Sequence, residues 1–201
     1  MAGYHPWFSY LISTTSDPIS KDEHYHSLFL PDSVGNVTAN AINSESTNLS
    51  EPDSLESQFA TLLVNLPDPR PLSEVLIELR QNLSDFSASM LGEVGLDGGF
   101  CIPFDHLASP RHRTPFTIPL AHQVAILEAQ IEVAVELGRN ISVHSVKSEQ
   151  ATLELFDKMK RKFGEKWNRI SVDIHSCGFI PQTWKDMEVC FGDPIIVKYI
   201  I

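Results

Sequence analysis

The sequence has few cysteines, fewer basic than acidic residues and no long apolar stretch. Its three cysteines, Cys101, Cys177 and Cys190, show no CxxC spacing and would leave one thiol unpaired in any disulfide scheme, which favours reduced intracellular thiols. The 15 Lys and Arg residues against 26 Asp and Glu give a net charge of -11, which argues against a surface that coats nucleic acid or anionic membranes. This charge does not exclude a nuclease, because a bound metal ion can supply positive charge locally.

Signals for membrane insertion and secretion are also lacking. No segment approaches the roughly 20 consecutive apolar residues of a membrane span. Residues 1–7 lack the basic start and the long apolar run of a signal peptide. We therefore expect an intracellular protein, cytoplasmic or nuclear, with no membrane partner.

The length of 201 residues suits a single domain with a sizeable core. Residues from about 13 to 56 are rich in Ser, Asn, Asp and Thr and can bury too little apolar surface to offset the entropy lost on ordering. We therefore expect one domain over 1–201 with a mainly disordered surface insertion at about 13–56. His24 and His26 within it form an HxH pair, whose rings would share one side of an extended strand, but ordinary surface roles are favoured there over metal ligation.

Apolar periodicity predicts strands that alternate with helices. Strands are expected at 90–96, 141–144 and 170–175, with partial strand patterns at 3–8 and 194–201. Helices are expected at 57–66, 71–86, 119–137, 148–163 and 181–189, and a long loop at 98–117. Repeated strand–helix units predict a parallel α/β sheet, whose reactive groups gather at the C-terminal ends of the strands. So few strands cannot close an eight-stranded barrel, which takes roughly 250 residues.

Three residues occupy matching positions on successive predicted strands. Glu93 lies in a strand too apolar to hold an unpaired charge cheaply, and His144 and His175 end the next two strands. One such residue alone would favour a hydrogen-bonded core side chain, whereas three matching positions favour a shared site. Their oxygen and nitrogen donors suit a divalent ion, without distinguishing Zn²⁺, Mn²⁺ and Mg²⁺, that would activate water. Asp97 either orients a ligand or caps the next turn, and His5 is a candidate pocket residue.

Four motifs carry a family resemblance. They are Gly3-Tyr4-His5-Pro6, Gly92-Glu93-Val94-Gly95-Leu96-Asp97, Val143-His144-Ser145 and Ile174-His175-Ser176-Cys177-Gly178. In this order they resemble the TatD family of metal-dependent hydrolases and deoxyribonucleases. Two further stretches, Trp7-Phe8 and Asp22-Glu23-His24-Tyr25, resemble a fungal branch described as interacting with the anaphase-promoting machinery.

The resemblance implies a TIM-type (β/α) barrel that cleaves phosphodiester bonds, as a deoxyribonuclease does. It implies that Glu93, His144 and His175 bind a divalent metal ion and that Glu93 is catalytic. The family takes further ligands from an HxH pair on its first strand and an aspartate on its last, and we find no counterpart of either. We therefore expect a partial barrel, incomplete at the N- and C-terminus, as in a fragment of a longer chain. The alternative is a non-catalytic interaction protein that retains a relic of the barrel and binds a cell-cycle or scaffold partner.

Overall fold

The computed structural model describes residues 9–12, 19–30, 54–105, 110, 112–175, 177, 179, 181–183 and 185. The strand patterns expected at 3–8 and 194–201 lie outside these residues, as do 13–18 and 31–53 of the expected insertion. The helix expected at 181–189 is described only near its start, where 181–183 and 185 are helical.

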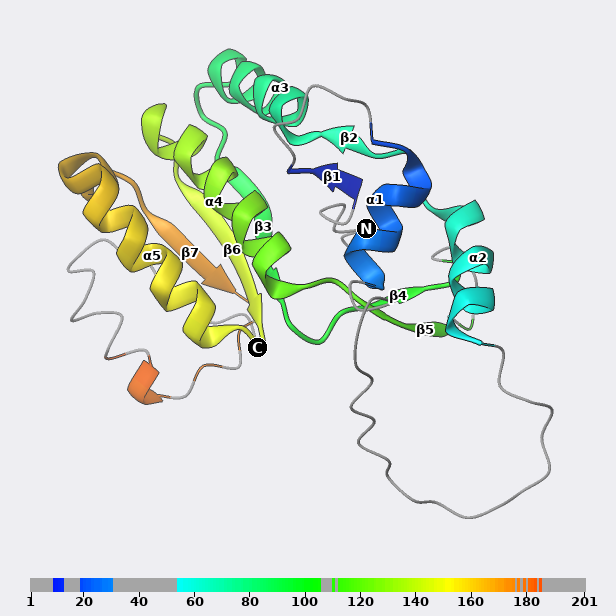
Figure 1. The fold of residues 1–201 in the computed structure, drawn as a ribbon. Coiled ribbons are helices and arrows are strands. Elements are labelled where there is room, and N and C mark those ends of the chain that lie inside the picture. Colours follow the sequence, from blue (N-terminus) through cyan, green and yellow to red (C-terminus); the bar gives the residue numbers. More distant parts are fainter. Residues whose placement is uncertain are drawn as a thin grey trace.

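The largest sheet among the described residues has three parallel strands (Figure 1). Its strands pair in the order β3 (Leu91–Asp97), β6 (Ile141–Val146) and β7 (Val172–His175). Helices α4 (Leu120–Glu136) and α5 (Glu149–Phe163) connect successive strands, because parallel neighbours need a crossover. The predicted parallel α/β sheet is confirmed. The described strands form no closed barrel, so the TIM-type barrel stays a prediction.

Sequence signals set the limits of the helices that cover this sheet. Helices α3 (Leu72–Asp85) and α4 follow Pro71 and Pro119, whose fixed φ suits the entry to a helix. Helix α5 ends at Gly164, whose φ of 51° is a left-handed conformation that glycine adopts without a steric penalty. A short 3-10 helix, η2 (Gly164–Arg169), then leads towards β7. The ends of α3, α4 and α5 lie within one residue of the bounds predicted from the sequence.

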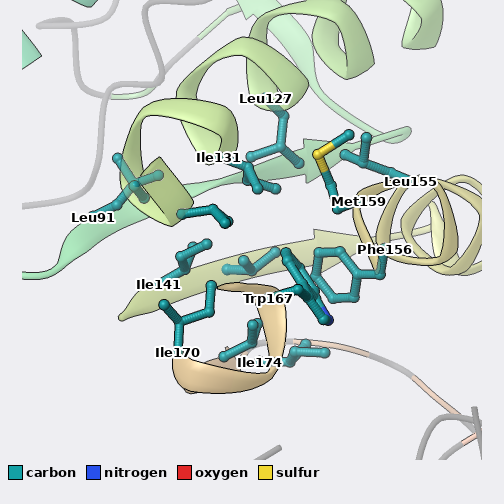
Figure 2. Packing of buried hydrophobic residues seen from close by; sticks show 14 of the residues in the cluster. Leu91, Leu127, Ile131, Ile141, Leu155, Phe156, Met159, Trp167, Ile170 and Ile174 are labelled. Atoms are coloured by element: carbon teal, nitrogen blue, oxygen red, sulfur yellow. The ribbon is translucent and has the colours of Figure 1, made fainter. Parts of the chain in front are cut away.

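The main apolar core fills the space between one face of the sheet and helices α3, α4 and α5 (Figure 2). Phe156 of α5 is fully buried and lies 5.6 Å, between ring centroids, from Trp167 of η2. Burying a large apolar side chain contributes about 1.5–3 kcal/mol. The strands and helices that supply the core are therefore held together by the side chains of Leu91, Leu127, Ile131, Ile141, Leu155, Phe156, Met159, Trp167, Ile170 and Ile174.

A second apolar cluster lies between two N-terminal helices and a short antiparallel strand pair. Helices α1 (Lys21–Phe29) and α2 (Leu55–Asn65) pack against β4 (Cys101–Pro103) and β5 (Arg113–Thr117). Phe29 of α1 stacks on Phe116 of β5 with ring centroids 5.8 Å apart. Nearby, β1 (Tyr10–Leu11) pairs in parallel with β2 (Arg70–Pro71).

The structure differs from two predictions in this second cluster. Residues 98–117, expected to be a loop, contain β4 and β5, because Thr114 and Phe116 alternate into the core along β5. Residues 21–29 of the expected disordered insertion form α1. Residues 55 and 56, at the end of that insertion, lie in the first turn of α2. The disorder expected at 13–18 and 31–53 stays a prediction.

Local capping explains why α1 forms in so polar a stretch. The N–H of Glu23 donates to the Ser20 hydroxyl oxygen at 3.2 Å, and the N–H of Ser20 donates to Glu23 Oε2 at 2.9 Å. Fully buried Tyr25 then anchors the helix in the second cluster. Because residues two apart on a helix lie about 200° apart around its axis, His24 and His26 do not share one side. None of the described helices combines the length and apolar character needed to cross a bilayer.

Candidate metal centre

A bulge in β3 decides which of its side chains face away from the main core. The register shifts between Leu91 and Val94, where three steps along β3 span two along β6. Leu91 and Leu96 both pack in the main core, although residues five apart on a regular strand point to opposite faces. The extra residue therefore places Glu93 and Asp97 on the face opposite the core.

The polar face of the sheet is this opposite face, with the side chains of Glu93, Asp97, Ser142, His144 and Asp173. The Ser142 hydroxyl donates to Asp173 Oδ2 at 3.2 Å. Asp173 was not among the residues that sequence reasoning singled out, because it lies inside a strand rather than at its end. The alternation of Asp173 with buried neighbours on β7 is the signal that could have found it.

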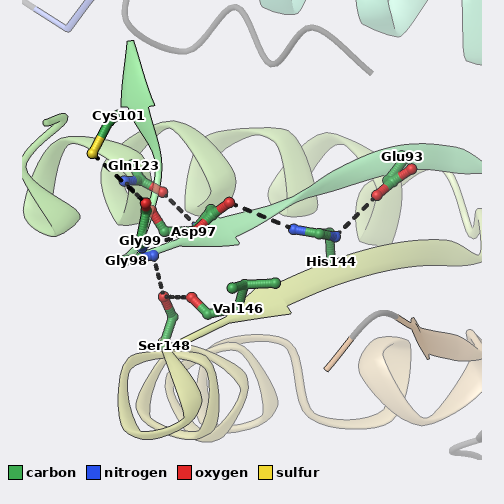
Figure 3. A network of polar contacts seen from close by, with 9 residues as sticks. All are labelled: Glu93, Asp97, Gly98, Gly99, Cys101, Gln123, His144, Val146 and Ser148. Atoms are coloured by element: carbon green, nitrogen blue, oxygen red, sulfur yellow. Dashed lines mark hydrogen bonds and ion pairs between the residues drawn. The ribbon is translucent and has the colours of Figure 1, made fainter. Parts of the chain in front are cut away.

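His144 lies between two carboxylates on the polar face (Figure 3). Its Nδ1 is 3.2 Å from Glu93 Oε1, and its Nε2 is 4.0 Å from Asp97 Oδ2. The side chains of His144 and Asp97 are only 15% and 17% exposed, whereas that of Glu93 is 43% exposed. Solvent and solutes can therefore reach this group from the side of Glu93.

Close approach of β3 and β6 requires glycine at position 95. Gly95 pairs with His144 across the two strands. A Cβ at position 95 would lie 1.9 Å from the carbonyl oxygen of His144, far inside any van der Waals contact. The missing side chain thus lets Glu93 and Asp97 flank the imidazole.

The Asp97 carboxylate also fixes the turn after β3. Its Oδ1 accepts a hydrogen bond from the N–H of Gly99 at 2.8 Å. The N–H of Gly98 donates to the carbonyl of Val146 at 2.8 Å and to the Ser148 hydroxyl at 3.0 Å, which ties the turn to the end of β6. The sequence leaves two roles open for Asp97, capping the turn and orienting a ligand. In the structure Oδ1 caps the turn, while Oδ2 faces the imidazole.

Gln123, in the first turn of α4, holds the backbone of Asp97. Its Oε1 accepts from the N–H of Asp97 at 2.8 Å, and its Nε2 donates to the carbonyls of Asp97 at 3.1 Å and Ile118 at 3.0 Å. The residue is fully buried. Sequence reasoning missed it, because a glutamine on an amphipathic helix looks like a solvated residue.

The backbone of β7 brings His175 next to His144, with which it pairs directly. Nothing further is described of the His175 side chain, and His5 lies outside the described residues. The ligand role of His175 and the pocket role of His5 therefore stay predictions.

Two donor atoms on the polar face are of the kinds that bind divalent metal ions. Glu93 and His144 bring together one carboxylate oxygen and one imidazole nitrogen, which zinc and manganese both accept. Across the described part of the chain, no three His, Cys, Asp or Glu side chains converge on a single point. Asp97 is not part of such a group, because it faces the other nitrogen of the imidazole.

The position of Asp97 suits a supporting role beside a metal ion. A histidine that binds metal through one ring nitrogen usually donates the N–H of its other nitrogen to a carboxylate. Glu93 and Nδ1 of His144 would therefore hold the ion, with Asp97 as the acceptor for the Nε2 N–H and with His175 at the adjacent position.

Cys177 follows the end of β7 by two residues and is a poor candidate for this site. Burial raises the pKa of its thiol, and hydrogen bonds from backbone N–H groups only partly oppose that effect. The thiol is therefore protonated at neutral pH, whereas metal binding and nucleophilic attack both need the thiolate.

Carboxylate and imidazole donors that gather on one face of a parallel α/β sheet can hold a metal ion that activates water. The chain is 28% identical over 176 residues to Cut9-interacting protein scn1 of Schizosaccharomyces pombe, a match that covers 82% of this chain and 44% of scn1. It is 27% identical over 150 residues to the uncharacterized deoxyribonuclease YMR262W of Saccharomyces cerevisiae, a match that covers 72% of this chain and 39% of that protein.

These two relatives confirm the resemblance predicted from the motifs, to the TatD family and to its fungal, Cut9-interacting branch. The chain spans less than half the length of either relative. No protein-family model and no solved structure matches the chain.

Proposed function

We propose that the chain acts as a TatD-type metal-dependent hydrolase of phosphodiester bonds, with DNA as its substrate. The observation that carries the proposal is the approach of Glu93 Oε1 to within 3.2 Å of His144 Nδ1 on the solvent-accessible side of the polar face. The similarity to a yeast deoxyribonuclease supports the choice of substrate.

The residues of the polar face divide into two roles in this proposal. Glu93, His144 and His175 hold the divalent ion. Such an ion supplies a nucleophilic water at neutral pH and offsets negative charge on the phosphate. Glu93 presents its carboxylate to the substrate from the exposed side, while the Asp97 carboxylate faces Nε2 at 4.0 Å and orients the imidazole. Because acidic residues outnumber basic ones, a bound cation would reduce the repulsion that an anionic substrate meets at this face.

Cleavage of a fluorescent double-stranded oligonucleotide tests this proposal. We expect cleavage by the purified chain with Mn²⁺, Mg²⁺ or Zn²⁺, loss of cleavage in EDTA, and a loss of about 100-fold or more in Glu93→Ala and His175→Ala. Glu128→Gln is the matched control, because Glu128 pairs with Lys158 on the surface formed by α4 and α5. Unchanged cleavage in both Glu93→Ala and His175→Ala would contradict the hydrolase function.

A second candidate is a non-catalytic protein that binds a partner from the cell-cycle machinery in the cytoplasm or nucleus. The similarity to a Cut9-interacting protein over 82% of the chain favours it. A pull-down with purified Cut9 as the probe separates the two candidates. The binding function predicts a complex that persists in EDTA and in Glu93→Ala, whereas loss of the complex on chelation would count against it.

A further inference from the structure

Gln123 is a polar residue at a fully buried position of α4, where an apolar side chain would satisfy packing. Further along α4, the core residues Leu127 and Ile131 are apolar. A buried amide without hydrogen bonds is costly, so an amide at the start of α4 persists only where its partners match it. Here Gln123 uses its oxygen and both N–H donors on the two peptide groups of Asp97 and on the carbonyl of Ile118.

The contacts of Gln123 fix the direction of the Asp97 side chain. An acceptor on the N–H and a donor on the carbonyl of the same residue hold the peptide planes on both sides of its Cα. The hydrogen bond from the Gly99 N–H to Asp97 Oδ1 then sets the carboxylate, which leaves Oδ2 facing Nε2 of His144 at 4.0 Å. Hydrogen bonds therefore link the buried amide to the Asp97 carboxylate, and a separation of 4.0 Å between Oδ2 and Nε2 links that carboxylate to the imidazole.

We infer that Gln123 is a positioning residue of the metal centre, which acts through Asp97 to orient the imidazole of His144. This inference rests on the proposed hydrolase function and deepens it. Because it is fully buried, Gln123 touches neither solvent nor substrate. Its effect on the metal centre passes through the Asp97 carboxylate alone.

The test uses Gln123→Met, which keeps the length of the side chain and removes all three hydrogen bonds. Outer partners of metal-binding histidines typically change metal affinity by about 10- to 100-fold. We therefore expect calorimetry with Zn²⁺ alone to show a dissociation constant raised by about that factor. Gln123→Asn, which keeps the amide on a shorter side chain, should have a smaller effect in the same direction, and it replaces Gln123→Met if the latter does not fold.

The control variant is Thr114→Val, which also removes a buried hydrogen-bonding group. The Thr114 hydroxyl donates to the carbonyl of Ile102 at 2.6 Å and accepts from the N–H of Phe116 at 3.2 Å, within the β4–β5 pair. We expect this variant to unfold at a lower urea concentration than the wild type and to bind Zn²⁺ with unchanged affinity. A general loss of stability is thereby separated from a loss of positioning.

A double-mutant cycle shows whether Gln123 acts through Asp97. Asp97→Asn removes the carboxylate charge but keeps the backbone groups that Gln123 contacts. Adding Gln123→Met to Asp97→Asn should change the Zn²⁺ dissociation constant by less than about 2-fold, because the effects of residues in one chain of contacts do not add. Fully additive effects would overturn the inference.

The ¹⁵N signals of the His144 ring in the metal-free protein, at one fixed pH, give a readout that needs no metal. We expect Gln123→Met to shift the Nε2 signal, and Thr114→Val to leave it in place. Unchanged ring signals in Gln123→Met would refute the positioning role, whereas a wild-type protein that takes up none of Zn²⁺, Mn²⁺ and Mg²⁺ would refute the hydrolase function instead.

Discussion

Gly95→Ala is the substitution whose effect the structure defines most closely. The new Cβ would lie 1.9 Å from the carbonyl oxygen of His144 and 2.7 Å from its carbonyl carbon and its nitrogen. All three atoms belong to the backbone of β6, so no side-chain rotation relieves the contact. Since ordinary contacts begin at 3.4 Å, the two strands would have to separate by about 1.5 Å (3.4 minus 1.9).

Such a separation disrupts the hydrogen bonds between β3 and β6 near the substitution and loosens the core behind them. Each lost backbone hydrogen bond costs about 1 kcal/mol, and overpacking adds about 1–3 kcal/mol. We therefore expect Gly95→Ala to lower the free energy of unfolding by about 3–5 kcal/mol, which is a large part of the 5–15 kcal/mol typical of a native domain.

Urea unfolding followed by tryptophan fluorescence, to which buried Trp167 contributes, measures this change. Gly99→Ala, in the turn that follows β3, is the matched control. The Cβ at position 99 would meet the flexible side chain of Lys147, with Cδ at 3.2 Å and Nζ at 3.4 Å. We expect the control to stay within about 0.5 kcal/mol of the wild type. A Gly95→Ala protein as stable as the control would refute the close contact between β3 and β6.

Three further predictions concern the core, the cap of α1 and a thiol. Phe156→Ala should lower the free energy of unfolding by about 3–5 kcal/mol in the same assay, whereas Phe86→Ala, at a residue 66% exposed, should change it little. Hydrogen bonds from the backbone N–H and the hydroxyl of Ser20 lower the pKa of Glu23 below its ordinary 4.5, so the stability that this carboxylate provides is present above pH 4.5 and is lost as the pH falls through the lowered pKa. Comparison of the wild type with Glu23→Gln by urea unfolding between pH 7 and pH 3 should show their difference shrinking over that range, and a difference independent of pH would contradict the cap. Because burial raises the pKa of Cys177 above its ordinary 9.0, iodoacetamide at pH 7.5 should alkylate this thiol more slowly than a free cysteine peptide, as mass spectrometry can follow.

The parallel sheet and its helices could be predicted from sequence because local signals and tertiary packing agree there. Pro71 and Pro119 begin helices, Gly164 ends one, and buried and partly buried residues alternate along the whole of β6. The α1 helix was missed because the composition of the surrounding segment outweighed a local capping box at Ser20 and Glu23.

The candidate site could be predicted only in part. Strand ends indicated Glu93, His144 and Asp97, which the structure brings together. The bulge that turns Glu93 towards His144 depends on the register between two strands, and the role of Gln123 depends on contacts 26 residues away along the chain. A single sequence carries no local signal for either feature.

The second apolar cluster has a consequence for how the protein is synthesised. Phe29 of α1 leaves the ribosome 87 residues before Phe116, the aromatic residue on which it stacks (116 minus 29). At translation rates of about 5–20 residues per second, the apolar face of α1 waits roughly 4–17 s for that partner. During this interval the nascent chain exposes an aromatic surface, to which chaperones can bind before β5 emerges.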